Sequence, residues 1–121
     1  MSYNAYATLQ KAAESPRDLE IRAISFVTRQ LTDANAAGAD SMSRIRALNN
    51  NMRMWSLLVQ DLSNPDNGLP EAIKGRYISL GLFARRFSLK ALTDASDLGV
   101  LIRLNSDVLE ALDYQRQALA A

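Results

Sequence analysis

The residues that most resemble a chemical site are the stretch NPDNG at positions 64–68, which combines side-chain oxygens with a glycine, as a calcium loop does. The register does not fit a calcium loop. With Gly68 at the sixth position, Pro65 would occupy a ligand position and Lys74 would stand in place of the bidentate glutamate. We therefore predict a structural turn here, with no metal and no other cofactor.

Paired carboxylates are the second candidates for catalysis, namely Asp61 with Asp66 and Asp94 with Asp97. General acid–base catalysis needs such a pair in a pocket. All four residues instead fall at expected helix ends, where capping accounts for them. The chain also has no histidine and no cysteine, which excludes Ser-His-Asp and Cys-His sites and nearly every zinc arrangement. We expect a protein that is not an enzyme.

Basic side chains form two small groups: Arg44, Arg46 and Arg53, and Arg85, Arg86 and Lys90. The chain carries 14 basic and 13 acidic residues, a net charge of +1, so no overall field favours nucleic acid. Such groups usually form a solvated face, although they could also border an acidic partner or touch RNA. They contain no stacking aromatic residues, so we expect no nucleic-acid partner and keep RNA as the second hypothesis.

The length and composition fit one domain over residues 1–121, because 121 residues with 48% hydrophobic content suffice for one core. The opening residues lack a basic segment followed by an apolar run, and the most apolar later stretch, 78–84, is too short to cross a bilayer. We expect a soluble, unprocessed, cytoplasmic protein without a membrane partner.

Apolar residues recur at helical spacing, which predicts an all-α fold. We expect an antiparallel bundle of four long helices over residues 15–118, preceded by a short N-terminal helix over residues 1–14. Ser15 as N-cap and Pro16 at the first position predict a helix from Pro16 to about Ala36. A left-handed Gly38 would end it, and Asp40 or Ser41 would cap the next helix. The expected inward stripe of the first long helix is Leu19, Ala23 or Ile24, Phe26 or Val27, and Leu31.

The other three long helices show the same alternation of three-residue and four-residue steps. Their expected core positions are Ile45, Leu48, Met52, Trp55, Val59 and Leu62; then Ile73, Tyr77, Leu80, Ala84, Phe87 and Ala91; and finally Leu98, Leu101 or Ile102, Asn105, Val108 or Leu109, and Leu112. Trp55 is expected in the core. The third long helix carries a second apolar stripe of Ile78, Leu82 and Leu89, and the last is expected to begin near Asp94 or Ser96.

The stretch WSLLVQDLSNPDNGLP, from Trp55 to Pro70, resembles the central signature of the bacterial flagellar biosynthesis regulator FlaF family. Two flanking features are similar to that family in order and spacing: Tyr3 and Tyr6 before the SPRDLE segment at 15–20, and ISLGLFARR at 78–86. The resemblance covers nearly the whole chain, although residues 40–51 match no characteristic pattern. The structural motif residues are Ser15, Pro16, Arg17, Trp55, Asn67, Leu69 and Pro70.

The resemblance implies a cytoplasmic protein that binds flagellin and supports its synthesis and export, opposed by the translational regulator FlbT. The expected ligands are the amphipathic terminal helices of flagellin, which would bind in an apolar groove. The candidate contact residues are Tyr3, Tyr6, Leu82, Phe83, Arg86 and Phe87. The two tyrosines would either anchor their segment to the bundle or contact the partner. The alternative function is post-transcriptional regulation of flagellin, through its mRNA or through FlbT.

Overall fold

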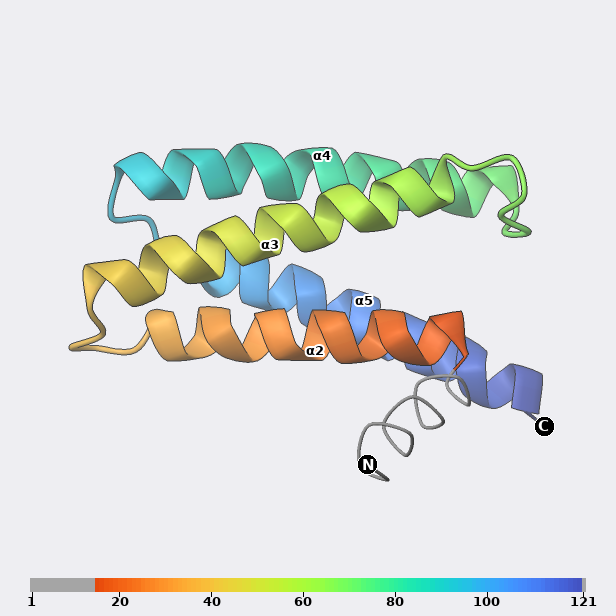
Figure 1. The fold of residues 1–121 in the computed structure, drawn as a ribbon, viewed down its shortest axis with the longest axis horizontal. Coiled ribbons are helices and arrows are strands. Elements are labelled where there is room, and N and C mark those ends of the chain that lie inside the picture. Colours follow the sequence, from red (N-terminus) through yellow and green to blue (C-terminus); the bar gives the residue numbers. More distant parts are fainter. Residues whose placement is uncertain (1–14, 121) are drawn as a thin grey trace, which may run out of the picture.

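The computed structural model describes residues 15–120, which form four α-helices (Figure 1). The helices are α2 (Pro16–Ala34), α3 (Ser41–Leu62), α4 (Glu71–Thr93) and α5 (Gly99–Ala120). No strand occurs within this described part of the chain, and the predicted all-α class is confirmed. The short helix predicted over residues 1–14 lies outside the described residues.

The starts of α2 and α3 carry the predicted side-chain caps. The Ser15 hydroxyl accepts the backbone N–H of Asp18 at 3.1 Å. The Asp40 carboxylate accepts the N–H of Ser43 at 2.7 Å. Each bond satisfies a backbone donor that has no partner within its own helix. Gly38, in the connection between these helices, has a φ of 85°, the left-handed conformation that its sequence position predicts.

The end of α2 comes earlier than predicted, at Ala34 instead of about Ala36. The reason is Asn35, whose side chain reaches the start of α5. Its Nδ2 donates to Asp97 Oδ1 at 2.9 Å, and its Oδ1 accepts the N–H of Leu98 at 3.0 Å. A tertiary contact therefore sets this boundary.

The start of α5 comes later than predicted, at Gly99 and not near Asp94 or Ser96. Asp94 accepts both the backbone N–H and the hydroxyl of Ser96, which forms a turn before the helix. The Arg44 guanidinium donates to the carbonyls of Ala91, Asp94 and Ser96 at 3.2, 3.3 and 2.7 Å. One cation from α3 thus stabilises the negative end of α4 and the turn that follows.

Successive helices run in opposite directions along the long axis of the molecule, and α5 passes behind α2 and α3 in the view shown (Figure 1). α3 packs against both α2 and α4, and α2 packs also against α5, whereas α4 and α5 make few contacts. The side chain of Arg17, at the start of α2, donates to Gln115, near the end of α5, at 2.7 Å. In this view α2 and α3 lie side by side in front of α5, and their exposed sides together form the outer face of the molecule (Figure 1).

The inward face of α2 differs from the predicted stripe. Leu19 was expected inside but is 47% exposed, and Phe26 is 59% exposed. The sequence left two pairs of alternatives open, and one residue of each pair is buried: Ile24 is buried and Ala23 exposed, and Val27 is buried and Phe26 exposed. The buried apolar residues of α2 are Ile24, Val27, Leu31 and Ala34.

The inward face of α3 is rotated slightly from the predicted seam. Ile45 is 40% exposed, so its assignment to the core was wrong, and Met52 and Val59 are only partly buried. The physical reason is Asn51, a polar residue that is buried because its amide has partners on two other helices. The buried residues of α3 are Ala47, Leu48, Asn51, Met54, Trp55, Leu58 and Leu62.

The buried face of α4 consists largely of small residues, which lets α3 approach closely. Ile73, Leu80 and Phe87 were expected in the core and are only partly buried. A Cβ added to Gly81 would lie 2.5 Å from Val59 Cγ2, so only glycine fits there without movement. The buried residues of α4 are Lys74, Tyr77, Gly81, Ala84, Ser88 and Ala91.

The centre of the bundle contains a buried chain of hydrogen bonds. Trp55 Nε1 donates to Asn105 Oδ1 at 2.9 Å, and Asn105 Nδ2 donates to Asn51 Oδ1 at 2.9 Å. Asn51 Nδ2 in turn donates to Ser88 Oγ at 3.3 Å. The predicted burial of Trp55 and of the α5 stripe is confirmed: Leu98, Leu101, Asn105, Val108 and Leu112 are all buried.

Candidate functional site

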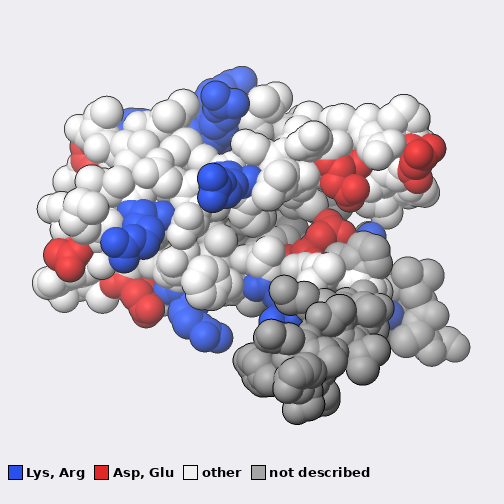
Figure 2. Space-filling model, in the orientation of Figure 1, with Lys and Arg blue, Asp and Glu red and all other residues white. Residues whose placement is uncertain are grey.

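An apolar groove with a volume of about 550 Å³ lies between α2 and α3. Figure 2 shows it as a hollow in the outer face that these helices form. The wall from α2 includes Leu19, Ala23 and Phe26, and the wall from α3 includes Met54 and Leu57. The volume falls in the range of ordinary ligand sites.

Three large apolar side chains in this groove are exposed to solvent. Leu19 is 47% exposed, Phe26 is 59% exposed and Leu57 is 61% exposed. A single exposed apolar residue is ordinary on a protein surface. Three that line one concavity leave a contiguous apolar patch in water, which marks a binding surface. The groove is therefore the best candidate for the functional site.

The dimensions of the groove suit a helix. Its lining runs from Leu19 to Val27 on α2, about 12 Å at 1.5 Å per residue. On α3 the lining runs from Asn50 to Asp61, about 16 Å. These lengths correspond to two or three turns of a bound helix, and the hollow is open along its outer side (Figure 2).

Charged residues lie at the borders of the groove. Glu20 on α2 and Asp61 on α3 both line it, and acidic side chains stand on both sides of the hollow at the end near the start of α2 (Figure 2). Burial raises the pKa of Glu20, and the negative charge of Asp61 raises it further, although Arg17 opposes the shift. Arg53 lines the groove further from this end.

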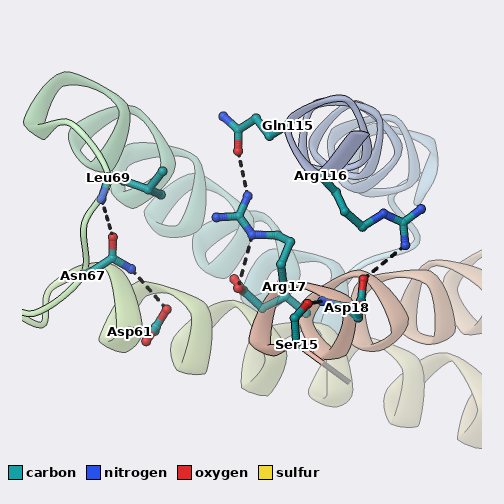
Figure 3. Close-up of polar contacts among 9 residues, drawn as sticks. Ser15, Arg17, Asp18, Asp61, Asn67, Leu69, Gln115 and Arg116 are labelled. Atoms are coloured by element: carbon teal, nitrogen blue, oxygen red, sulfur yellow. Dashed lines mark hydrogen bonds and ion pairs between the residues drawn. The ribbon is translucent and has the colours of Figure 1, made fainter. Parts of the chain in front are cut away.

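Polar contacts hold the acidic end in place, as Figure 3 shows. Arg17 lies 3.7 Å from Glu20 through its Nε, while its Nη1 donates to Gln115 at 2.7 Å. Asp18, next in the chain, accepts Arg116 at 3.2 Å. The contact with Arg116, together with bonds from Ser15, lowers the pKa of Asp18. The start of α2 is thereby fixed against the last turns of α5.

The loop between α3 and α4 also supports this end (Figure 3). Asn67 Oδ1 accepts the N–H of Leu69 at 3.0 Å, and Asn67 Nδ2 donates to Asp61 at 3.2 Å. Asn64 Oδ1 similarly accepts the N–H of Asp66 at 2.9 Å. The side-chain oxygens of the loop's two asparagines thus accept backbone N–H groups and stabilise the turn. Pro70 stands directly before α4 as its N-cap residue.

The α4 residues predicted to bind a partner lie away from the groove. Leu82 is 50% exposed and Phe83 is 45% exposed, whereas Phe87 is only partly buried and Arg86 is exposed. The Phe83 and Phe87 rings have centroids 6.0 Å apart, and the ammonium of Lys90 lies 5.8 Å from the Phe87 centroid. These side chains form a second exposed surface. Tyr3 and Tyr6 lie outside the described residues.

Three of the four carboxylates considered for catalysis act as hydrogen-bond acceptors, namely Asp61, Asp94 and Asp97. Asp94 has its pKa lowered chiefly by the Ser96 hydroxyl, and Asp97 has its pKa lowered chiefly by the N–H of Gly99 and then by Asn35. A lowered pKa keeps both groups ionised, which suits turn formation and opposes the donation of a proton.

The sequence model of the family described as Flagellar protein FlaF matches residues 2–112. This chain belongs to the FlaF family. The match includes the whole of both groove walls, so the groove lies within the part of the chain that defines a FlaF protein. No curated protein and no solved structure matches the chain.

Within residues 15–120 of this FlaF protein, no helix is long and apolar enough to cross a bilayer.

Sequence reasoning missed the groove in this FlaF protein because its lining residues were assigned to the core or left aside. Leu19 was placed in the inward stripe, and Leu57 lies beside the buried Leu58. One signal was available, because Phe26 and Val27 are adjacent and cannot both face inward on a helix. An aromatic residue next to a better core candidate indicates a second apolar face.

Proposed function

We propose that this FlaF family member binds flagellin in the cytoplasm by holding one amphipathic flagellin helix in the groove between α2 and α3. Binding would keep flagellin unassembled and so support its synthesis and export, in a chaperone-like role without catalysis. The observation that carries this proposal is the exposure of Leu19, Phe26 and Leu57 in one concavity long enough for two or three helical turns.

The physical basis is the burial of apolar surface on both partners. A helix with apolar residues at positions i, i+3, i+4 and i+7 presents one stripe, and the groove offers a matching apolar floor. Covering the exposed parts of Phe26 and Leu57 removes them from water, which stabilises the complex by roughly 25 cal/mol per Å² of apolar surface. The family match supports flagellin as the source of such a helix.

A second candidate function is post-transcriptional regulation of flagellin, through its mRNA or through FlbT. The observation that favours it is the α4 surface, where exposed Leu82 and Phe83 lie beside Arg85 and Arg86. Basic and aromatic side chains together can contact RNA or an acidic protein. The two functions thus use different faces of the molecule.

A pair of phenylalanine variants separates the two surfaces. Phe26 lies in the groove and Phe83 lies on α4, and both are exposed, so aspartate at either position should leave the helical circular dichroism intact. We expect Phe26→Asp to abolish co-purification with flagellin from motile cells, because it places a charge on the apolar floor. Phe83→Asp should retain flagellin.

The opposite result, with flagellin lost only from Phe83→Asp, would reject the groove and favour the α4 surface.

The salt dependence of the complex distinguishes a protein partner from an RNA partner in the same assay. A complex formed by apolar burial should persist from 50 to about 300 mM salt, whereas phosphate-dominated binding would weaken by orders of magnitude. Binding that is lost on combining Arg85→Ala with Arg86→Ala, and that falls steeply with salt, would support the RNA function.

A further inference from the structure

The groove has an acidic end, and this feature bears on which helices it accepts. We infer that the helix held in the groove carries a lysine or arginine at the end that lies beside Glu20 and Asp61, so that these two carboxylates select the partner. The inference rests on the proposed function and adds a charge requirement to it.

The two carboxylates come from opposite walls of one groove. Glu20 belongs to the second turn of α2 and Asp61 to the last turn of α3, and both line the concavity. Asp61 forms no salt bridge within the described part of the chain, where its side chain accepts a hydrogen bond from the neutral amide of Asn67. Arg17 is the cation next to Glu20, but at 3.7 Å, and its Nη1 is engaged by Gln115. This end of the groove therefore has more negative than positive charge.

The pKa of Glu20 supports this interpretation. Burial raises it, Arg17 opposes this shift, and the nearby Asp61 carboxylate adds to it, so that the ionised form of Glu20 is less well stabilised in the free protein than in water. A cation placed near the two carboxylates would attract both of them, and this attraction offsets the cost of burying Glu20 and the repulsion between the two negative charges. A ligand that supplies this cation therefore gains binding energy that a neutral ligand does not.

The shape of the site favours a lysine or arginine side chain. The carboxylates adjoin an apolar floor that includes Leu19 and Leu58. Lysine and arginine have long apolar stems that can lie along such a surface while the charged group reaches its end. Toward the other end of the groove, Arg53 lies about 12 Å from Asp61 along α3, at 1.5 Å per residue. Its charge disfavours a basic residue there, so the preference applies to one end of the bound helix.

The test uses the full chain and three synthetic amphipathic helical peptides that differ at one terminal position, which is lysine, glutamine or glutamate. Titration calorimetry measures each dissociation constant. We expect the lysine peptide to bind about fivefold to tenfold more tightly than the glutamine peptide, and the glutamate peptide to bind more weakly than both. Combining Glu20→Gln with Asp61→Asn should make the three affinities equal.

A matched control is Asp66→Asn, which removes one negative charge from the exposed loop nearby but not from the groove. It should preserve the preference for lysine, whereas Asp61→Asn alone should reduce it. Circular dichroism and thermal unfolding establish that each variant is folded. The Glu20→Gln substitution should not destabilise the protein, because it removes a poorly stabilised charge.

Equal binding of the three peptides to the wild-type chain would overturn the inference, as would a lysine preference that survives in the double variant. If flagellin still co-purifies through Phe26 in that case, the proposed function stands without the charge requirement. If no peptide binds and flagellin is not retained, the proposed function itself fails. Sedimentation that shows a dimer undisturbed by the lysine peptide would assign the groove to a second copy and overturn both.

Discussion

The indole N–H of Trp55 on α3 donates to the side-chain oxygen of Asn105 on α5 at 2.9 Å, with both residues shielded from solvent. This bond satisfies a donor that burial would otherwise leave without a partner. Asn105 also donates to Asn51 on α3, so its side-chain oxygen and nitrogen must meet two different α3 residues at once. A shift of α5 along α3 would break both bonds. The contact therefore fixes the register of α5 against α3.

Replacing Asn105 with alanine should destabilise the fold by about 3 kcal/mol, because it leaves the Trp55 donor and the Asn51 acceptor unpaired next to a small cavity. Urea unfolding followed by tryptophan fluorescence measures the change. Asn49→Ala is the matched control, since Asn49 is exposed on α3 and alanine favours the helix by about 0.5 kcal/mol. A loss below about 0.5 kcal/mol for Asn105→Ala would show that the buried chain of bonds contributes little.

The close approach of α3 and α4 at Gly81 makes a second prediction. Gly81→Ala should destabilise by about 1 kcal/mol, because crowding against Val59 and Trp55 outweighs the better helix propensity of alanine. Gly75→Ala, with no atom within 4 Å of the added carbon, should stabilise by up to about 1 kcal/mol. Adding Val59→Ala to Gly81→Ala should remove the closer of the two contacts and leave only the one with Trp55. Thermal unfolding of the wild type, the two glycine variants and the double variant measures these stabilities. Equal effects of Gly81→Ala and Gly75→Ala would contradict the prediction.

Core and surface aromatic residues should respond differently to truncation. Trp55→Ala should destabilise by roughly 3–5 kcal/mol, since a buried side chain is replaced by a cavity. Phe83→Ala should destabilise by less than about 1 kcal/mol, because 45% of Phe83 is already exposed. Chemical denaturation compares the two variants. Similar losses would mean that the outer face of α4 packs more tightly than its exposure indicates.

The raised pKa of Glu20 predicts a pH dependence of stability. The folded state binds the Glu20 proton more tightly than the unfolded state does, so protonation favours folding. The free energy of unfolding should therefore gain a contribution from Glu20 as pH falls from above the raised pKa to the ordinary glutamate range. Above the raised pKa this contribution is absent. Glu20→Gln should remove that part of the pH profile, and denaturation at a series of pH values measures it. Identical profiles for both chains would exclude Glu20 as the source.

Much of the fold follows from local sequence signals. Ser15 and Asp40 cap their helices as predicted, and the α5 stripe from Leu98 to Leu112 is buried as its spacing indicates. Departures occur where a distant residue decides the outcome. Asn51 is buried because Ser88 and another helix supply partners, and no pattern within α3 contains that information.

The candidate site was less predictable because exposure depends on how the helices are placed side by side. The spacing of Leu19 is compatible with either the core or a surface groove, and only the position of α3 relative to α2 decides between them. The α4 residues were different, since two stripes on one helix cannot both be buried in a small bundle. Leu82 and Phe83 are indeed exposed, yet they lie outside the groove between α2 and α3.

The contact between Arg17 and Gln115 joins positions 98 residues apart in the chain, and it has a consequence for the order of assembly during translation. The hairpin of α3 and α4 depends on neighbouring segments and can form while the ribosome is still elongating the chain. α2 receives its second partner only when α5 has emerged. A nascent chain that stops after α4 thus presents the residues of the groove without the support that positions one of its walls, so that the proposed binding site is complete only once α5 has been synthesised.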